Sequence, residues 1–387
     1  MKHNFDKETI RRGTQCVKWD EAANAGVLPM WVADMDFEVA PCITEALRKR
    51  VAHGIFGYTL VPESYYEAVI RWFSRRHGWD IRRDWILYTS GVVPAMSCVI
   101  KALCMPGEKV LVQTPVYNCF FSSVHNNGCQ VAESELLRTG DTYEIDFEDF
   151  ERKCADEKTT LFLLCNPHNP AGRVWSKAEL QRMNDICKRH GVRVVSDEIH
   201  CELVMPGYRY TPFAAVSDGC LDNSVTLSSP SKSFNTAGLQ MANIVCKDAE
   251  VRRRIDRAIN INEVCDVNPF GPIALEAAYN RGEEWLEELN RYLSQNYLTL
   301  REFFKDRLPQ IKVMRLEGTY LVWADIKSTG LSSDELSERL LKEGKVLVNS
   351  GTMYGRKAGE GYIRINIACP RSRMLEGLER IAAVLGK

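Results

Sequence analysis

The stretch that decides the fold is residues 224–238, which read SVTLSSPSKSFNTAG. Its first part, residues 225–227, has the apolar and β-branched character of a buried strand, and a cluster of hydroxyl residues follows. Lys232 lies inside that cluster, and a long charged side chain directly after a buried strand is unusual. We interpret Lys232 as an amine nucleophile that forms a Schiff base with an aldehyde cofactor. The alternative for this residue is an ordinary loop lysine in water.

On either side of this stretch, continuous apolar runs alternate with amphipathic segments. This alternation predicts an α/β fold with a mostly parallel sheet that helices cover on both faces. We expect strands at residues 85–89, 109–113, 160–165, 192–195 and 244–246, and helices at 41–53, 64–77 (with Ser64 as its cap), 92–103 and 177–190.

Unusual polar residues follow four of these strands. In an open α/β sheet, ligands bind at the carboxyl ends of the strands, so these residues are expected to share one site. They are Ser90 with Gly91, Asn169, Asp197 with His200, and Lys232.

The length of 387 residues exceeds what one hydrophobic core usually supports, which predicts two domains. After about residue 270 the pattern changes to long amphipathic helices mixed with short strands. We expect an N-terminal segment at 1–45 that joins the smaller domain, a large domain at 46–275, and a small α+β domain at 276–387.

Composition excludes several function classes. The net charge of −1 leaves no electrostatic basis for binding nucleic acid or an anionic membrane. No apolar run approaches the roughly 20 residues of a membrane span. The 14 cysteines include no C-x-x-C pair, which favours reduced thiols in the cytoplasm. The sequence also lacks the paired Cys and His spacing of a metal site, and no metal is expected.

The choice of cofactor follows from the motifs that remain. Neither a dinucleotide-binding G-x-G-x-x-G nor a phosphate-binding G-x-x-x-x-G-K-[ST] is present. A lysine, a carboxylate and an amide at adjacent strand ends suit pyridoxal 5'-phosphate (PLP), which needs a lysine for its aldehyde. It also needs a carboxylate against its pyridine nitrogen, and Asp197 can supply that group.

Five further residues complete this interpretation. Asn169 can donate to the phenolic oxygen of the ring, and Gly91 with Val92 opens a helix whose N–H groups can bind the phosphate. Ser229 can add a hydroxyl donor, and Tyr117 can stack on the ring. Three of the proposed site residues also have a structural alternative. Asp197 could cap the segment that follows it, Asn169 could belong to a turn, and Tyr117 could belong to the core. Their occurrence together, at successive strand ends, favours the site.

The same motifs resemble a known family. NPHNPAGRVW (166–175), SDEIH (196–200) and SPSKSFN (229–235) resemble fold-type I PLP enzymes of the class I/II aminotransferase superfamily. Together with LPMWVADMDF (28–37) and YIRINIACPR (362–371), they are similar to the MalY/PatB branch of cystathionine β-lyases and C–S lyases. The resemblance covers nearly the whole chain and implies the aminotransferase fold, with a seven-stranded sheet in a large PLP-binding domain.

The resemblance also implies roles for individual residues. Lys232 is implied as the Schiff-base lysine and as the base for the Cα proton, and a homodimer is implied because Tyr58 would reach the neighbouring subunit's site. The other implied roles are Asp197 on the pyridine nitrogen, His200 and Asn169 at the phenolic oxygen, Tyr117 on the ring face, Gly91 and Val92 on the phosphate, and Arg364 on the substrate carboxylate.

The implied reaction is α,β-elimination from cystathionine or a related S-substituted cysteine, which gives a thiol, pyruvate and ammonia. An aminotransferase with the same residues is the alternative, and a non-catalytic regulatory protein that retains the fold is a further one.

Two positions depart from the pattern. Gln240 lies where many superfamily members carry a phosphate-binding arginine, and Glu202 lies where relatives often have aspartate; Glu202 receives no role.

Overall fold

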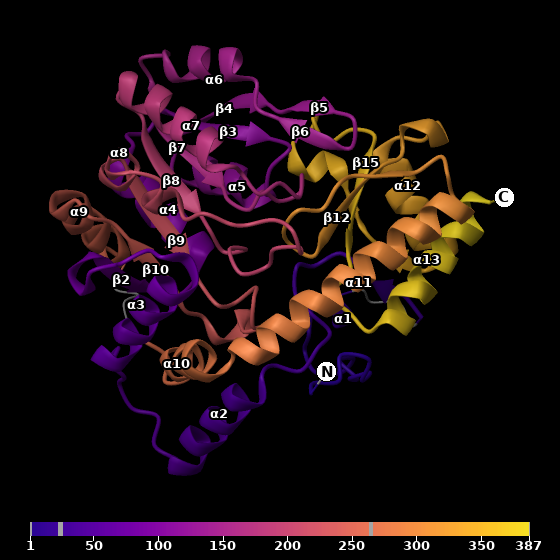
Figure 1. Ribbon diagram of the computed structural model, residues 1–387, viewed down its shortest axis with the longest axis horizontal. Helices are drawn as coiled ribbons and strands as arrows, with labels where there is room; N and C mark the ends of the chain where they lie inside the picture. The colour runs from indigo at the N-terminus through magenta and orange to yellow at the C-terminus, as the bar shows by residue number, and fades with distance from the viewer. Residues whose placement is uncertain (1, 22–25, 263–265, 387) are drawn as a thin grey trace.

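The central feature of the protein is a seven-stranded sheet, seen edge-on among its helices in Figure 1. The computed structural model describes residues 2–21, 26–262 and 266–386. The strands of this sheet, in spatial order, are β2 (Ile86–Thr89), β10 (Ala242–Val245), β9 (Ser224–Ser228), β8 (Arg193–Asp197), β7 (Thr159–Cys165), β3 (Lys109–Thr114) and β4 (Gln130–Glu135).

All of these strands run parallel except β10, which is antiparallel to both of its neighbours. The predicted α/β fold with a mostly parallel sheet is therefore confirmed. Because β2, β3, β7, β8 and β9 point the same way, their carboxyl ends lie at one edge of the sheet.

Helices cover both faces of this sheet, as the continuous apolar strands predicted. Along β7, Leu161 and Leu163 pack in one core with α4 (Val92–Leu103), α5 (Asn118–Asn126) and α9 (Ala249–Asn260). The alternate residues Phe162 and Leu164 pack in another core with α6 (Phe147–Cys154), α7 (Lys177–Arg189) and α8 (Asp218–Asp222). Successive side chains of a strand point to opposite faces, which explains the division.

A second sheet of four strands lies in the C-terminal part of the chain (Figure 1). Its order is β11 (Lys312–Val313), β12 (Leu321–Asp325), β15 (Tyr362–Asn366) and β14 (Asn349–Ser350). Close to it, β1 (Leu28–Pro29) pairs in parallel with β13 (Val346–Leu347), so the N-terminal segment contacts C-terminal residues. The hairpin of β5 (Leu137–Thr139) and β6 (Thr142–Glu144) completes the strands of the described residues. We keep the domain limits 1–45, 46–275 and 276–387 as a proposal.

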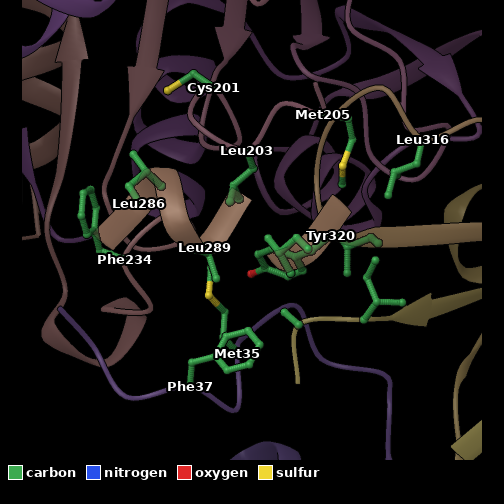
Figure 2. Packing of buried hydrophobic residues seen from close by; sticks show 14 of the residues in the cluster. Met35, Phe37, Cys201, Leu203, Met205, Phe234, Leu286, Leu289, Leu316 and Tyr320 are labelled. Carbon is green, nitrogen blue, oxygen red and sulfur yellow. The ribbon is translucent and has the colours of Figure 1, made fainter. Parts of the chain in front are cut away.

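The remaining helices pack mainly against one another or against the shorter sheets. α11 crosses the molecule diagonally in Figure 1, from α10 to α13. Figure 2 shows Met35 and Phe37 of the N-terminal segment next to Leu289 of α11, with Tyr320 close by, in one buried cluster. These helices are α1 (Val17–Asp20), α2 (Pro41–His53), α3 (Glu63–His77), α10 (Gly271–Arg281), α11 (Glu283–Arg307), α12 (Ser333–Arg339) and α13 (Arg371–Leu385).

The predicted cap of α3 is wrong. The helix begins at Glu63, and Pro62 occupies the N-cap position without a side-chain cap. The proline ring fixes the backbone angle φ at the start of the helix, so Ser64 falls inside the first turn.

Within the described residues, no helix is both long and apolar enough to cross a membrane.

Glu202, which the sequence left without a role, joins α3 to the segment after β8. Its buried carboxylate accepts hydrogen bonds from Trp72 Nε1 (2.6 Å) and Arg76 Nε (2.8 Å), and it lies 2.7 Å from His77 Nε2. Burial disfavours the charge, yet these donors hold the pKa of Glu202 below its usual value. The thiol of Cys201 lies beside this carboxylate. Because Arg76 and Trp72 already bind the oxygens, the geometry is that of a structural ion-pair cluster.

We expect Glu202→Ala to lower the free energy of unfolding by about 3–5 kcal/mol, because it removes the buried acceptor of Trp72, Arg76 and His77. Glu287 is the matched control: it lies 2.8 Å from the same guanidinium, but its side chain is 47% exposed. Glu287→Ala should cost less than about 1 kcal/mol. Urea denaturation of both variants measures the difference, and equal losses would contradict the structural role of Glu202.

Candidate cofactor site

A cavity of about 240 Å³ opens at the carboxyl edge of the seven-stranded sheet. The parallel strands bring its polar groups together, because each lies at the end of a strand or in the turn or loop that follows one. The cavity lining includes most of the predicted site residues, namely Gly91, Val92, Tyr117, Asn169, Asp197, His200 and Lys232.

Lys232 follows β9 and reaches into this cavity. Its Nζ donates to the carbonyl oxygen of Ala33 at 2.6 Å, a residue 199 positions away in the chain. Burial and the nearby Arg364 guanidinium lower the pKa of the Lys232 amine. A lysine held toward its neutral form is a nucleophile and a base, which distinguishes it from a loop lysine in water.

Asp197 ends β8 and is buried. One carboxylate oxygen accepts a hydrogen bond from the Ile199 N–H at 3.1 Å. Burial raises the pKa of this carboxyl to about 7, although the Ile199 N–H and Lys232 oppose the shift. A buried carboxylate of this kind is suited to a cationic partner, such as a protonated ring nitrogen.

His200 lies three residues after Asp197 and is also buried. Its Nδ1 has no hydrogen-bond partner among the described residues. Burial, with the positive charges of Lys232 and Arg364, lowers the pKa of the imidazole to about 3. The ring is therefore neutral at physiological pH.

Asn169 and Arg364 form a pair that joins the two sheets. Arg364 on β15 donates from Nη1 to Asn169 Oδ1 at 3.2 Å and from Nη2 to the Trp31 carbonyl at 2.7 Å. A guanidinium only donates, so the amide oxygen of Asn169 faces Arg364 and its NH₂ group remains for other partners. The Nε of Arg364 is buried without a partner among the described residues, and it is thus available for a carboxylate.

The N-terminus of α4 forms another wall of the cavity. Gly91 is the N-cap residue, without a side-chain cap, and Val92 begins the helix. The first N–H groups of a helix have no intrahelical acceptor, and together with the helix dipole they attract an anion.

Three predicted residues do not line the cavity. Arg364 is outside the lining and contacts it through its hydrogen bond to Asn169. The Ser229 hydroxyl donates to the Met241 carbonyl at 2.6 Å, so its proton is engaged, and Ser231 lines the cavity in its place. Tyr58 is 97% exposed on the loop between α2 and α3. Gln240, whose side chain is exposed, has a left-handed backbone (φ 52°) and is also outside the lining.

Several residues at the site carry no motif that the sequence reveals. Ala33 contributes a carbonyl, and Tyr320 donates its hydroxyl to the same oxygen at 2.9 Å. Tyr354 places its ring 4.7 Å from the Arg364 guanidinium carbon, a cation–π contact that supports the arginine from one face. Cys165, the last residue of β7, accepts from the Asn169 N–H. Two of them had a usable sequence signal: Ala33 lies in the quoted stretch 28–37, and Cys165 lies at a predicted strand end.

These groups fit PLP. A nucleophilic amine, a buried carboxylate suited to a cation, an amide donor and a helix N-terminus surround one cavity. They correspond to the aldehyde, pyridine nitrogen, phenolic oxygen and phosphate of the cofactor.

Comparison with known proteins extends this result. Residues 26–381 match the family described as aminotransferase class I and II. The chain is 45% identical to cystathionine beta-lyase PatB of Bacillus subtilis (strain 168) over 99% of its length and 100% of that protein. It is 33% identical to protein MalY of Escherichia coli (strain K12), with 97% of each chain covered.

Solved structures agree. PLP-containing cystalysin from Treponema denticola superposes with a TM-score of 0.97 at 35% identity, covering 100% of this chain and 99% of cystalysin. A PLP-bound putative aminotransferase from Clostridium difficile 630 has a TM-score of 0.96 at 41% identity, covering 99% and 100%. These likenesses confirm the predicted fold, the MalY/PatB resemblance and PLP as the cofactor.

The pKa of Asp197 leads to a stability prediction. The carboxyl titrates near pH 7 in the folded protein and near about 3.9 when unfolded. Between these values the folded, PLP-free protein holds the extra proton, so the free energy of unfolding falls as pH rises from about 4 to 7. Asp197→Asn removes this contribution, and it should stabilise the PLP-free protein at about pH 8 by up to about 4 kcal/mol.

Urea denaturation of the PLP-free proteins at about pH 5 and pH 8 measures the effect. The matched control is Asp256→Asn, at an exposed aspartate of α9. If both substitutions give the same pH dependence, the burial cost assigned to Asp197 is wrong.

Proposed function

The chain belongs to the class I and II aminotransferase family, and from that premise we propose that it is a PLP-dependent carbon–sulfur lyase. Its substrates are cystathionine or related S-substituted cysteines, which it converts to a thiol, pyruvate and ammonia. The observation that carries this proposal is the full-length likeness to a relative named cystathionine beta-lyase, in a chain that retains Lys232, Asp197 and Asn169 in the lining of one cavity and Arg364 bonded to Asn169.

Four residues hold the cofactor and substrate in this proposal. Lys232 binds the aldehyde, and Asp197 holds a proton on the pyridine nitrogen. Asn169, whose oxygen is engaged by Arg364, donates from its NH₂ group to the phenolic oxygen. Arg364 binds the substrate carboxylate through its remaining N–H groups.

Three further residues surround the ring and the phosphate. The N–H groups at Gly91 and Val92 bind the phosphate, and Tyr117 stacks on the ring. His200, neutral because burial lowers its pKa, lies at the phenolic side.

PLP supplies an electron sink for the negative charge that develops at the substrate Cα. The contribution of the chain is to orient that carbon and to move its proton. The Lys232 amine, whose pKa is lowered by burial and by Arg364, takes the Cα proton. The Cβ–S bond then breaks and its electron pair leaves with the thiolate, and the released enamine takes up water to give pyruvate and ammonia.

We expect the protein to release pyruvate from cystathionine without any keto-acid acceptor. Lys232→Ala should abolish both this release and the visible absorbance of lysine-bound PLP, because no other lysine lies in the cavity lining. Lys247→Ala is the control, since that side chain is 43% exposed in an ion pair with Asp222. A coupled pyruvate assay with a panel of S-substituted cysteines and aromatic amino acids measures the activity.

Other outcomes of this assay favour the alternatives. The likeness to a structure described as a putative aminotransferase favours transamination as the second candidate. A strict requirement for a keto acid would establish it, since reprotonation would then replace elimination. PLP binding without turnover of any amino acid tested would instead favour a regulatory protein that retains the fold.

The proposal includes a homodimer in which Tyr58 reaches the site of the other subunit. Its loop exposes an apolar cluster: Ile55, Phe56 and Leu60 are 67%, 52% and 74% exposed, together with Tyr58 itself. A contiguous exposed apolar surface of this kind is typical of an interface, and a second copy of this chain is the occupant we propose. A cytoplasmic location stays a prediction from the cysteine pattern.

Mixing two inactive variants tests this arrangement. In a heterodimer of Tyr58→Phe and Lys232→Ala chains, one site has an intact Lys232 and receives an intact Tyr58 from the partner. Random reassociation should therefore restore about a quarter of the unsubstituted activity. If Tyr58 acts within its own chain, every site lacks one group and the mixture stays inactive. Lys232→Ala mixed with itself is the control.

A further inference from the structure

Residues 31–36, which read WVADMD, form a strap that passes the cavity outside any helix or strand. Side chains from distant parts of the chain donate to its carbonyl groups. Asn366 Nδ2 donates to Val32 (2.5 Å) and Asp34 (2.7 Å), and Asn235 Nδ2 donates to Met35 (3.0 Å). One backbone hydrogen bond, from the Asp36 N–H to the Ala368 carbonyl (2.9 Å), also holds the strap, and the other long-range contacts named here come from side chains.

Two of the strap's carbonyls contact the proposed catalytic machinery. Lys232 donates to the Ala33 oxygen at 2.6 Å, and Arg364 donates to the Trp31 oxygen at 2.7 Å. Lys232 follows β9 of the large sheet, whereas Arg364 lies on β15 of the small one. The strap therefore links the proposed base to the proposed carboxylate-binding residue.

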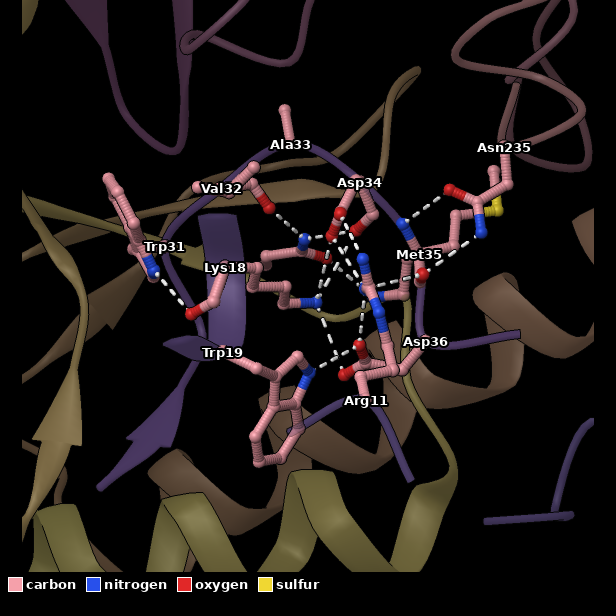
Figure 3. A network of polar contacts seen from close by, with 12 residues as sticks. Arg11, Lys18, Trp19, Trp31, Val32, Ala33, Asp34, Met35, Asp36 and Asn235 are labelled. Carbon is pink, nitrogen blue, oxygen red and sulfur yellow. Dashed lines mark hydrogen bonds and ion pairs between the residues drawn. The ribbon is translucent and has the colours of Figure 1, made fainter. Parts of the chain in front are cut away.

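Buried charges hold the strap from its other side. Figure 3 shows the side chains of Arg11, Lys18 and Trp19 pointing at Asp34 and Asp36. Lys18 Nζ lies 3.2 Å from Asp36 Oδ2 and 3.4 Å from Asp34 Oδ1, and the side chains of Lys18 and Asp36 are 1% and 0% exposed. Arg11 bonds both carboxylates at 2.6–2.8 Å, and Trp19 Nε1 donates to Asp36 at 2.9 Å.

The backbone of Lys18 contacts the strap as well, since its carbonyl accepts from Trp31 Nε1 at 3.1 Å. Burying an ion pair usually adds little net stability, because desolvation offsets the attraction between the charges. The pair does select one arrangement of the groups around it, because any displacement leaves a charge without its partner. A positional role is therefore the function that this pair can perform.

We propose that Lys18 and Asp36 are positioning residues, whose buried ion pair holds the strap so that the Ala33 carbonyl orients the Lys232 amine and the Trp31 carbonyl holds Arg364. This inference rests on the roles proposed for Lys232 and Arg364. The carbonyl oxygen accepts a hydrogen bond from an N–H of the free amine and has no proton to give to the nitrogen. The nitrogen lone pair then stays available, and its direction is set.

The test uses the PLP-loaded protein with L-alanine, which has no leaving group and cannot undergo elimination. Exchange of its Cα proton with solvent deuterium, followed by NMR, reports on Lys232. The dissociation constant of alanine, from the change in PLP absorbance on binding, reports on Arg364. Lys18→Met should slow exchange at saturating alanine by about 10- to 100-fold and weaken alanine binding, while Lys18→Arg should restore much of both.

Lys7→Met is the matched control, because it breaks an ion pair with Glu38 in the same N-terminal segment but at an exposed position. It should match the unsubstituted protein. If PLP-loaded Lys18→Met also matches it in exchange and in alanine binding, the proposal is overturned. Should Lys18→Met not fold, Asp36→Asn removes the negative charge of the pair, and unchanged exchange and binding there overturn the proposal equally.

Failure of the proposed lyase function gives a different pattern. The unsubstituted protein would then release no pyruvate from any S-substituted cysteine, yet alanine exchange and its dependence on Lys18 would remain measurable.

Discussion

The structure depends on one constraint, the parallel pairing of β7, β8 and β9. In this register Cys165 lies beside Asp197, and Asp197 beside Leu227, so the chain segments that follow the three strands begin side by side. Asn169, His200 and Lys232 are carried on those segments. The strand pairing therefore brings these three residues to one edge of the sheet although they are distant in the sequence.

The same pairing buries ionisable groups and pushes each toward its neutral form. Burial raises the pKa of Asp197 and lowers the pKa values of Lys232 and His200. Asp197, Lys232 and His200 therefore offer little charge to one another, and Arg364 is the exception among the site residues. The site is suited to a ligand that brings complementary charges, as PLP does with its phosphate and its ring nitrogen. The arrangement also keeps the lysine reactive, because a fully protonated amine is neither nucleophile nor base.

Most of the large sheet could be predicted because its signals are local. A strand buried on both faces is recognisable as a continuous apolar run, and the helices Pro41–His53 and Val92–Leu103 follow from the spacing of their apolar residues. The residues at the strand ends could be proposed for the same reason. Ser229 shows the limit of this reasoning, because a hydroxyl near the lysine can turn toward a backbone carbonyl such as that of Met241 instead of the cavity.

What could not be predicted is the geometry between the two sheets. The contact of Arg364 with Asn169 joins residues 195 positions apart, and that of Lys232 with Ala33 joins residues 199 apart. No local pattern specifies either one. Residues 28–37 have a composition too mixed for a strand, and their conformation becomes intelligible only when the buried charges of Lys18 and Asp36 and the partly buried Asp34 are seen behind them.

Neither sheet alone determines the distance between Lys232 and Arg364, since one residue belongs to each. That distance matters because the amine must reach the Cα proton of a substrate whose carboxylate the arginine holds. A segment bonded to both side chains supplies the missing restraint, and its carbonyls make equally short contacts with each. The N-terminal segment is thus a structural part of the site, although it carries no residue that the chemistry itself requires.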